Sequence, residues 1–286
     1  MKLCRFNDNR LGVVQGHEVL DVTAALAVLP TLHYPYPVQD QLVAYLPLLR
    51  ARIETLLGGA RRLPVPQVQL LSPVANPGKI IAAPVNYEKH LKEVLNDPAI
   101  HHNNQISHIQ RAGFFLKAGS SLQGVSSPIT LTLPERRTDH EVELVIVIGK
   151  TGRNIAATDA LAYVAGYSIG LDITIRGPEE RSLRKSPDGY TVLGPWLTTA
   201  DEIADPGQLA LELQVNGVTR QKSNTSDLIL DVPALIEYAS RFYTLHPGDL
   251  LFTGTPEGVS QLQAGDHLYA RIESLGDMTI GIQAAQ

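Results

Sequence analysis

The chain has 286 residues, of which 44% are hydrophobic and 19% are charged, and its formal net charge is −5. This composition predicts a soluble globular protein with a sizeable core, and the acidic balance with only short basic clusters disfavours a nucleic-acid partner. The single cysteine, Cys4, excludes an internal disulfide and a thiolate metal cage. No apolar run is long enough to span a membrane or act as a secretion signal, so we expect a cytoplasmic protein.

The N-terminal region combines short strands with one helical stretch. Turn residues separate strand-like runs over the first 25 residues, and apolar residues then recur at steps of three and four across Val38–Leu57. Four prolines follow between residues 62 and 78, where the pattern changes. We therefore predict a small α+β domain at residues 1–70 and a larger domain at residues 71–286.

The larger region consists mainly of short runs rich in β-branched residues. Two helical pieces interrupt them, at Ala156–Val164 and Val232–Phe242. This arrangement predicts an α+β fold whose large domain is a mostly β sandwich or roll. The strand-like runs are Lys79–Ala82, Ile129–Leu133, Glu141–Ile148, Val164–Ile169, Leu209–Val215, Asp249–Phe252, His267–Ile272 and Met278–Ile282.

The run that begins at Glu141 places two acids on a strand that is otherwise built for a core. Side chains two residues apart share a face, so Glu141 and Glu143 point one way while Val142 and Leu144 point the other way. Two carboxylates about 7 Å apart along a strand repel each other unless a cation lies between them. A solvated face of an antiparallel sheet is the alternative explanation.

A third acid supports the interpretation as a metal site. Asp172 ends the strand-like run YVAGYSIGLD, and Gly170, two residues earlier, leaves room for a group to approach the backbone. Three carboxylates without histidine or thiolate suit a hard ion, Mg²⁺ or Mn²⁺. The coordination positions left open can be filled by water and by a chelating 2-oxo acid.

His90 and Glu93 lie three residues apart, which makes them neighbours if this stretch is helical. A carboxylate bonded to one imidazole nitrogen orients the ring and raises its basicity, so the pair fits a general base acting on water. An exposed helix with mixed charges is the alternative. The polar segment 95–113 that follows is either a lid over a site or a solvated loop.

The large region contains, in this order, the motifs NYEKHLKE, FFLKAGSSLQG, DHEVELVIVIGK, YVAGYSIGLDIT, RKSPDGYTVLGPWLTTADEI, VNGVTRQ and HPGDLLFTGTPEGV. Their order and spacing resemble the fumarylacetoacetate hydrolase family over roughly residues 79 to 282. The resemblance implies a mixed β-sandwich roll with a small N-terminal α+β domain, a homodimer, and a Mg²⁺ or Mn²⁺ site.

The resemblance also implies roles for individual residues. Lys185, in a K-S-x-D motif, would stabilise a departing enolate, although a surface lysine in a basic run is the alternative. Arg176 would pair with a distal acid group of the substrate, or with Glu179 or Glu180. The implied roles are metal binding for Glu141, Glu143 and Asp172, catalysis for His90, Glu93 and Lys185, and substrate binding for Tyr87, Arg176 and Thr255.

The predicted reaction is metal-dependent hydrolysis of a C–C bond in an acylpyruvate-type 1,3-diketo acid, similar to fumarylpyruvate or fumarylacetoacetate. The small-molecule 2-oxo acid would chelate the metal while His90, oriented by Glu93, deprotonates water. Decarboxylation of oxaloacetate, isomerisation of a 2-hydroxy-diene-dioate and dehydration of a 2-keto-3-deoxy sugar acid are alternatives through the same enolate. A non-catalytic binding protein that keeps the scaffold is an alternative of a different class.

Overall fold

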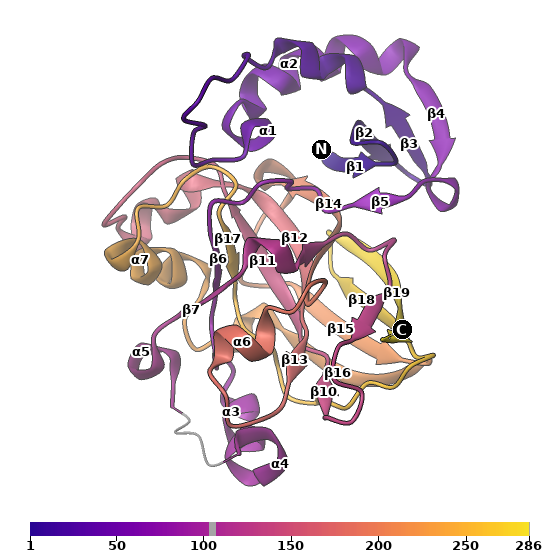
Figure 1. The fold of residues 1–286 in the computed structure, drawn as a ribbon. Coiled ribbons are helices and arrows are strands. Elements are labelled where there is room, and N and C mark those ends of the chain that lie inside the picture. Colours follow the sequence, from indigo (N-terminus) through magenta and orange to yellow (C-terminus); the bar gives the residue numbers. More distant parts are fainter. Residues whose placement is uncertain (103–106, 286) are drawn as a thin grey trace.

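The computed structural model describes residues 1–102 and 107–285. Its large sheets and short helices confirm the predicted α+β fold class (Figure 1). The strands of the main sheet follow the order β4 (Arg61–Pro64), β3 (Glu18–Asp21), β2 (Arg10–Gln15), β1 (Lys2–Phe6), β14 (Thr191–Thr199), β12 (Val164–Asp172), β11 (Val142–Ile148), β17 (Leu250–Phe252), β6 (Ile80–Ala82) and β7 (Phe115–Lys117), with β5 (Leu70–Leu71) beside β1 and β8 (Leu122–Gln123) beside β14.

A second sheet and a short strand pair complete the β structure. The second sheet follows the order β16 (Val218–Asn224), β15 (Ala210–Val215), β18 (His267–Ile272), β19 (Gly276–Ala284) and β9 (Ile129–Leu131), and the pair consists of β10 (Thr138–Asp139) and β13 (Thr174–Ile175). The helices are α1 (Gln41–Ala44), α2 (Leu46–Leu56), α3 (Glu88–Asn96), α4 (Pro98–His101), α5 (Ile109–Ala112), α6 (Arg181–Lys185) and α7 (Val232–Phe242). None of these described helices has the length and apolarity needed to cross a membrane.

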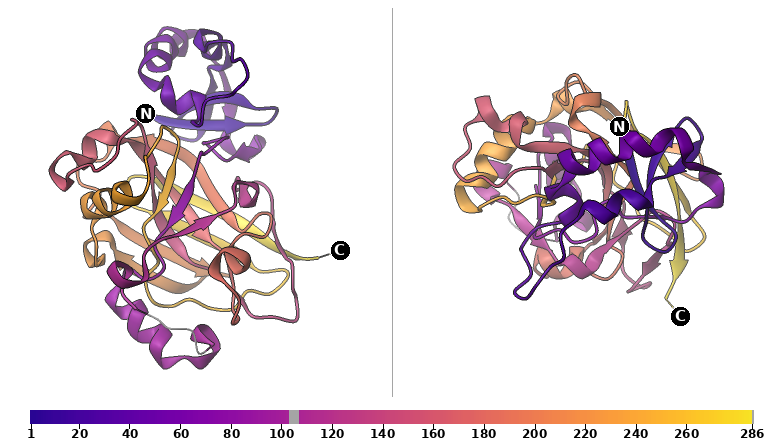
Figure 2. Two further views of the ribbon diagram at one scale, coloured as in Figure 1. Left: turned by 60° about the vertical axis from the view of Figure 1, so that its left-hand side comes forward. Right: turned by 90° about the horizontal axis from the view of Figure 1, so that it is seen from above.

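The N-terminal strands are part of the main sheet, because β1 pairs antiparallel with β14 through Leu3 and Leu197. One hydrophobic cluster extends from Leu3 and Ile53 to Val145 and Phe252 in the centre of the sheet. The N-terminal elements nevertheless cap one end of the molecule, while α3 and α4 lie at the opposite end (Figures 1 and 2).

The predicted helix over Val38–Leu57 is divided into α1 and α2. It begins later than predicted because the side chain of Asp40 caps α1 by accepting from the Val43 N–H, at 3.1 Å. Pro47 lies in the first turn of α2, where a missing backbone donor is tolerated. The predicted apolar stripe is confirmed at Leu49 and Ile53, which are fully buried.

Strands β11 and β12 lie at the centre of the main sheet and are almost entirely buried. Val142 and Leu144 pack into one hydrophobic cluster, as predicted, and Val145 packs into a second cluster on the other face. The antiparallel register pairs Glu143 with Gly170. This register brings the end of β12 beside the beginning of β11.

Further segments differ from the predicted elements, and β7 and β16 are among the strands that were not predicted. The helical stretch predicted at Ala156–Val164 is a 3-10 helix, η5, over Ala157–Tyr163, whereas α7 has the predicted bounds. Strand β14 was not predicted, since Pro195 lacks a backbone donor and lies in its middle. An irregularity in the pairing with β12 accommodates this proline.

Candidate metal centre and active site

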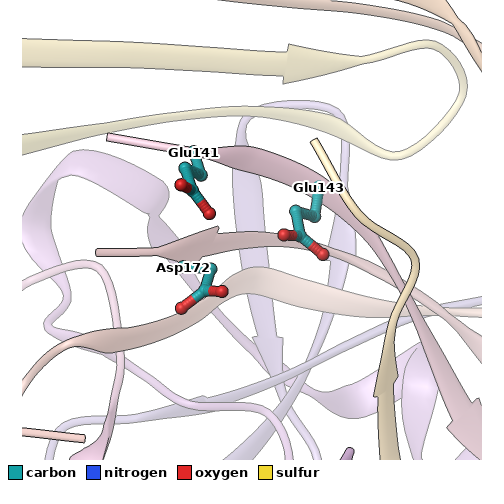
Figure 3. Close-up of side chains that lie close together, drawn as sticks. All are labelled: Glu141, Glu143 and Asp172. Atoms are coloured by element: carbon teal, nitrogen blue, oxygen red, sulfur yellow. The ribbon is translucent and has the colours of Figure 1, made fainter. Parts of the chain in front are cut away.

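Three buried acids converge where β11 begins and β12 ends. Glu141, Glu143 and Asp172 each offer a carboxylate oxygen within 4.8 Å of the others, and their side chains face one another (Figure 3). Their exposed fractions are 4%, 1% and 1%. The alternative of a solvated sheet face is therefore wrong for this pair of glutamates.

The three acids differ in electrostatic environment. Burial together with the charges of Asp172 and Glu141 raises the pKa of Glu143 well above its usual range. Burial also favours a raised pKa for Glu141, but the charges of Lys185 and Arg176 outweigh it and hold that pKa below its usual range. The crowded negative charge at Glu143 and the all-oxygen donor set fit a hard divalent cation.

Two lysines contact the acid cluster. Lys185 Nζ donates to Glu141 Oε2 at 2.7 Å and to Asp172 Oδ2 at 2.6 Å, and it is 5% exposed, so the alternative of a surface lysine is wrong. Lys117 Nζ donates to Asp172 Oδ1 and, at 2.9 Å, to the Tyr190 carbonyl. Burial lowers the pKa of Lys117, and the nearby Asp172 charge opposes this effect.

Lys117 is not among the predicted site residues, although it lies in the motif FFLKAGSSLQG. In β7 the side chains of Phe115 and Lys117 are buried while Leu116 between them is exposed. The period-two pattern of FFLK therefore places the lysine on the same face as a core aromatic residue. That alternation could have predicted Lys117 as a buried cation.

Arg176 is bound to two acids of the protein, one of which belongs to the acid cluster. Its Nε donates to Asp139 Oδ2 at 2.7 Å and its Nη2 to Glu141 Oε1 at 2.8 Å. The expected alternative pairing with Glu179 is wrong, because Arg136 binds both oxygens of Glu179 at 2.8 and 2.9 Å. Arg176 thus fixes Glu141, and Asp139 is its second, unpredicted partner.

Helix α3 brings the predicted dyad together. His90 Nδ1 lies 2.8 Å from Glu93 Oε2, and Glu93 Oε1 accepts from the Gly258 N–H at 2.9 Å. Because a carboxylate only accepts, Nδ1 is the donor in this contact, and in the neutral ring Nε2 is the acceptor nitrogen. His90 is 3% exposed, so the alternative of a fully exposed helix does not hold for this face.

The segment 95–113 is partly helical rather than a plain loop. It contains the end of α3, all of α4 and all of α5. Asn103 and Asn104, part of its predicted polar character, lie outside the described residues.

A cavity of about 370 Å³ is lined by His90 of the dyad and by Glu141 of the acid cluster. Four of the predicted site residues line it, namely His90, Glu141, Arg176 and Lys185. The other five do not, namely Tyr87, Glu93, Glu143, Asp172 and Thr255. The complete lining is Pro84, Val85, His90, Val94, Ile100, His101, Glu141, Arg176, Pro178, Glu179, Glu180, Arg181, Arg184 and Lys185. His90 and Glu141 therefore face one shared space.

The turn after β17 supports the site through its backbone. The Gly254 N–H donates to Glu143 Oε2 at 2.7 Å, so the backbone of this turn holds one acid of the cluster. The Thr255 hydroxyl donates to the Val142 carbonyl at 2.8 Å and accepts from Gln221 Nε2 at 2.7 Å. Thr255 therefore holds this turn against β11.

Tyr87 is 1% exposed, and its hydroxyl has no hydrogen-bond partner among residues 1–102 and 107–285. It lines a separate cavity of about 210 Å³. Burial and then the Glu143 charge raise the pKa of Tyr87, which places its phenol within the influence of the acid cluster.

The expected room at Gly170 is filled by the protein itself. A Cβ atom at this position would lie 2.4 Å from Val145 Cγ2 and 2.5 Å from the Phe252 ring. The glycine therefore permits close packing of a core aromatic residue beside the acids, not the approach of a ligand.

The model of the fumarylacetoacetate (FAA) hydrolase C-terminal family matches residues 79–283. The chain is 60% identical to the maleylpyruvate hydrolase of Aquipseudomonas alcaligenes, over 99% of this chain and 100% of that protein. It is 38% identical to the mitochondrial oxaloacetate tautomerase Fahd2a of Rattus norvegicus, over 79% and 75% of the two chains. The crystal structure of maleylpyruvate hydrolase from Sphingobium sp. SYK-6, in complex with manganese (II) ion and pyruvate, superposes with a TM-score of 0.85 at 42% identity and covers 100% of both chains.

Proposed function

Because the chain belongs to the fumarylacetoacetate hydrolase family, we propose that it is a metal-dependent hydrolase that converts maleylpyruvate to maleate and pyruvate. The prediction of a metal-dependent acylpyruvate hydrolase is confirmed by the 60% identity to a maleylpyruvate hydrolase and by the likeness to a manganese-containing structure. The observation that carries the proposal is the cavity shared by His90, which is bound to Glu93, and Glu141, which belongs to the acid cluster.

Glu141, Glu143 and Asp172 would hold Mg²⁺ or Mn²⁺ through their facing oxygens. When bound, the cation supplies Lewis-acid polarisation of the 2-oxo acid. The protein orients the carboxylates that would bind the cation, because Arg176 donates to Glu141 and the Gly254 N–H donates to Glu143.

The dyad supplies the nucleophile. His90 Nε2 accepts a proton from water while Glu93 stabilises the resulting imidazolium. The hydroxide adds to the acyl carbonyl, and the bond between that carbon and the pyruvate methylene breaks with its electron pair remaining on the methylene. Lys185 stabilises the enolate charge, and the proton on His90 returns to this carbon. Water is consumed, and one carboxylic acid and pyruvate are released.

We also propose that residues 1–70 form a supporting domain, that residues 71–286 form the catalytic domain, and that the protein is a cytoplasmic homodimer. The family match begins at residue 79, after the proline-rich stretch. Leu116 on the edge strand β7 and Leu183 on α6 are exposed apolar residues that a second copy would cover. Light scattering on the purified protein should give twice the monomer mass, and a monomer at all concentrations would exclude the dimer.

Product analysis tests the proposed reaction. The protein is stripped of metal, reloaded with Mn²⁺ or Mg²⁺, and incubated separately with maleylpyruvate, acetylpyruvate and oxaloacetate. We expect maleate and pyruvate in equal amounts from maleylpyruvate, and no turnover without metal. Turnover of oxaloacetate with neither acylpyruvate cleaved would replace the hydrolase with a decarboxylase or tautomerase.

A further inference from the structure

We propose that Arg181 and Arg184 of helix α6 bind the terminal carboxylate of the acyl group, and thereby select acylpyruvates that carry a second acid. This inference rests on the proposed function, because it concerns the distal end of the same substrate. Both guanidinium groups line the cavity that contains His90 and Glu141. Helix α6 would thus supply Lys185 to the acid cluster and two arginines to the distal end of the substrate.

The other cations of the cavity already have carboxylate partners within the protein. Arg176 is bound to Asp139 and Glu141, and Lys185 is bound to Glu141 and Asp172. Arg176 is therefore poorly placed for the distal acid group, which was its predicted partner.

Arg184 is a fixed and buried cation without a carboxylate partner in the described part of the chain. Its Nε donates to the Glu179 carbonyl at 2.7 Å and its Nη1 to the Ile175 carbonyl at 3.0 Å. The side chain is 7% exposed, and burial followed by the charges of Arg176 and Arg181 lowers its pKa. A buried charge that is satisfied only by neutral carbonyls favours the arrival of an anion.

Arg181 lies one helical turn before Arg184, on the same side of α6. No hydrogen bond or ion pair joins its half-buried guanidinium to the described residues, and only the charges of Glu180 and Glu141 attract it from nearby. Two guanidinium groups at this spacing match a carboxylate, which accepts paired N–H donors from arginine.

The acids near α6 do not already occupy these arginines. Glu179 is bound by Arg136, and Glu180 caps α6 by accepting from the Ser182 N–H at 3.3 Å. The helix therefore presents Lys185 to the acid cluster and Arg181 and Arg184 to the remainder of the cavity. This order places the 2-oxo acid end at the cluster and the second carboxylate at the arginines.

Substrate selectivity tests this inference. Maleylpyruvate and acetylpyruvate differ in the presence of the terminal carboxylate, so the ratio of their kcat/KM values reports recognition of that group and is insensitive to loss of folded protein. We expect Arg181→Met to lower this ratio by about 10- to 100-fold, as for one charge-assisted contact. Arg184→Lys keeps the positive charge but loses the paired N–H donors of the guanidinium group. It should lower the kcat/KM ratio less than Arg181→Met does. Arg153→Met, an exposed arginine outside the cavity, is the matched control.

Inhibition by maleate gives an independent readout with acetylpyruvate as substrate. The wild-type protein should be inhibited, and Arg181→Met should require about 10-fold more maleate or higher. An unchanged selectivity ratio in Arg181→Met, or a loss shared equally by both substrates, would overturn the inference while leaving the hydrolase function intact. Failure of the wild-type protein to cleave either acylpyruvate would instead remove the proposed function.

Discussion

The two walls of the cavity differ in how firmly their residues are held. On the strand wall, Glu141 lines the cavity, and Glu143 and Asp172 are buried close to it. Each of the three acids is bound by a cation or a backbone N–H. On the helix wall, His90 depends on Glu93, whose side chain is 24% exposed and which accepts from one N–H of the turn after β17. The electrostatic centre is therefore preorganised by the sheet, whereas His90 is carried by an element with fewer restraints.

Breaking the strand wall should have the largest effect. Glu143→Gln removes a metal oxygen and a negative charge while keeping the side-chain shape. We expect kcat/KM for maleylpyruvate to fall by about 10³-fold or more, since Lewis-acid stabilisation is worth several kcal/mol. Calorimetric titration with Mn²⁺ should show weakened binding, and binding equal to that of the wild type would remove Glu143 from the metal site.

Removing His90 from the helix wall should lower kcat without changing the affinity for Mn²⁺. His90→Ala is expected to lower kcat by about 10²–10⁴-fold because it removes the general base. Its Mn²⁺ affinity, measured in the same titration, should match that of the wild-type protein. An undiminished kcat would exclude His90 from the proton transfer.

The buried ion pairs of the strand wall should dominate stability. Lys117→Met leaves part of the Asp172 charge uncompensated, so we expect the free energy of unfolding of the metal-free protein to fall by about 3–5 kcal/mol. Lys89→Met is the control, since Lys89 and Glu257 form an exposed pair at 3.5 Å that is worth less than about 1 kcal/mol. Urea unfolding curves compare the two variants, and equal destabilisation would contradict the difference in burial.

The smallest effect should come from the residue that orients the base. Glu93→Gln keeps a hydrogen-bonding side chain but removes the charge beside His90, and we expect kcat to fall by about 10- to 100-fold. Glu88→Gln changes an exposed acid on the same helix and serves as the control. If both variants kept wild-type kcat, the tight His90–Glu93 contact would have no catalytic role.

The strand wall was more predictable from sequence than its surroundings. Period-two alternation around Glu141 and Glu143, with Asp172 at the end of a second apolar run, indicated a metal site but left a solvated sheet face as an alternative. The family resemblance then assigned the three acids to the metal. The partners of those acids come from elements distant in sequence, such as Lys117 on β7 and Gly254 after β17. Only the strand order reveals these contacts, because no local pattern encodes which strands become neighbours.

The fold was likewise predictable where a local pattern was regular and unpredictable where distant strands pair. Helix α7 was predicted with its observed bounds, since Asp231 caps its first turn and its apolar face is regular. Strand β14 was not predicted, because tertiary pairing on both sides overrides the local effect of Pro195. Arg176 was predicted to pair with a substrate acid group, or with Glu179 or Glu180, because no local pattern indicates that Asp139 lies beside it.

Anomalous diffraction from crystals grown with Mn²⁺ and pyruvate tests the central claim most directly. We predict one strong manganese peak at coordination distance, about 2.1 Å, from oxygens of all three acids, with pyruvate chelating the same ion. Density that shows these carboxylates bound only to Lys117, Lys185 and Arg176, with manganese elsewhere or absent, would contradict the account.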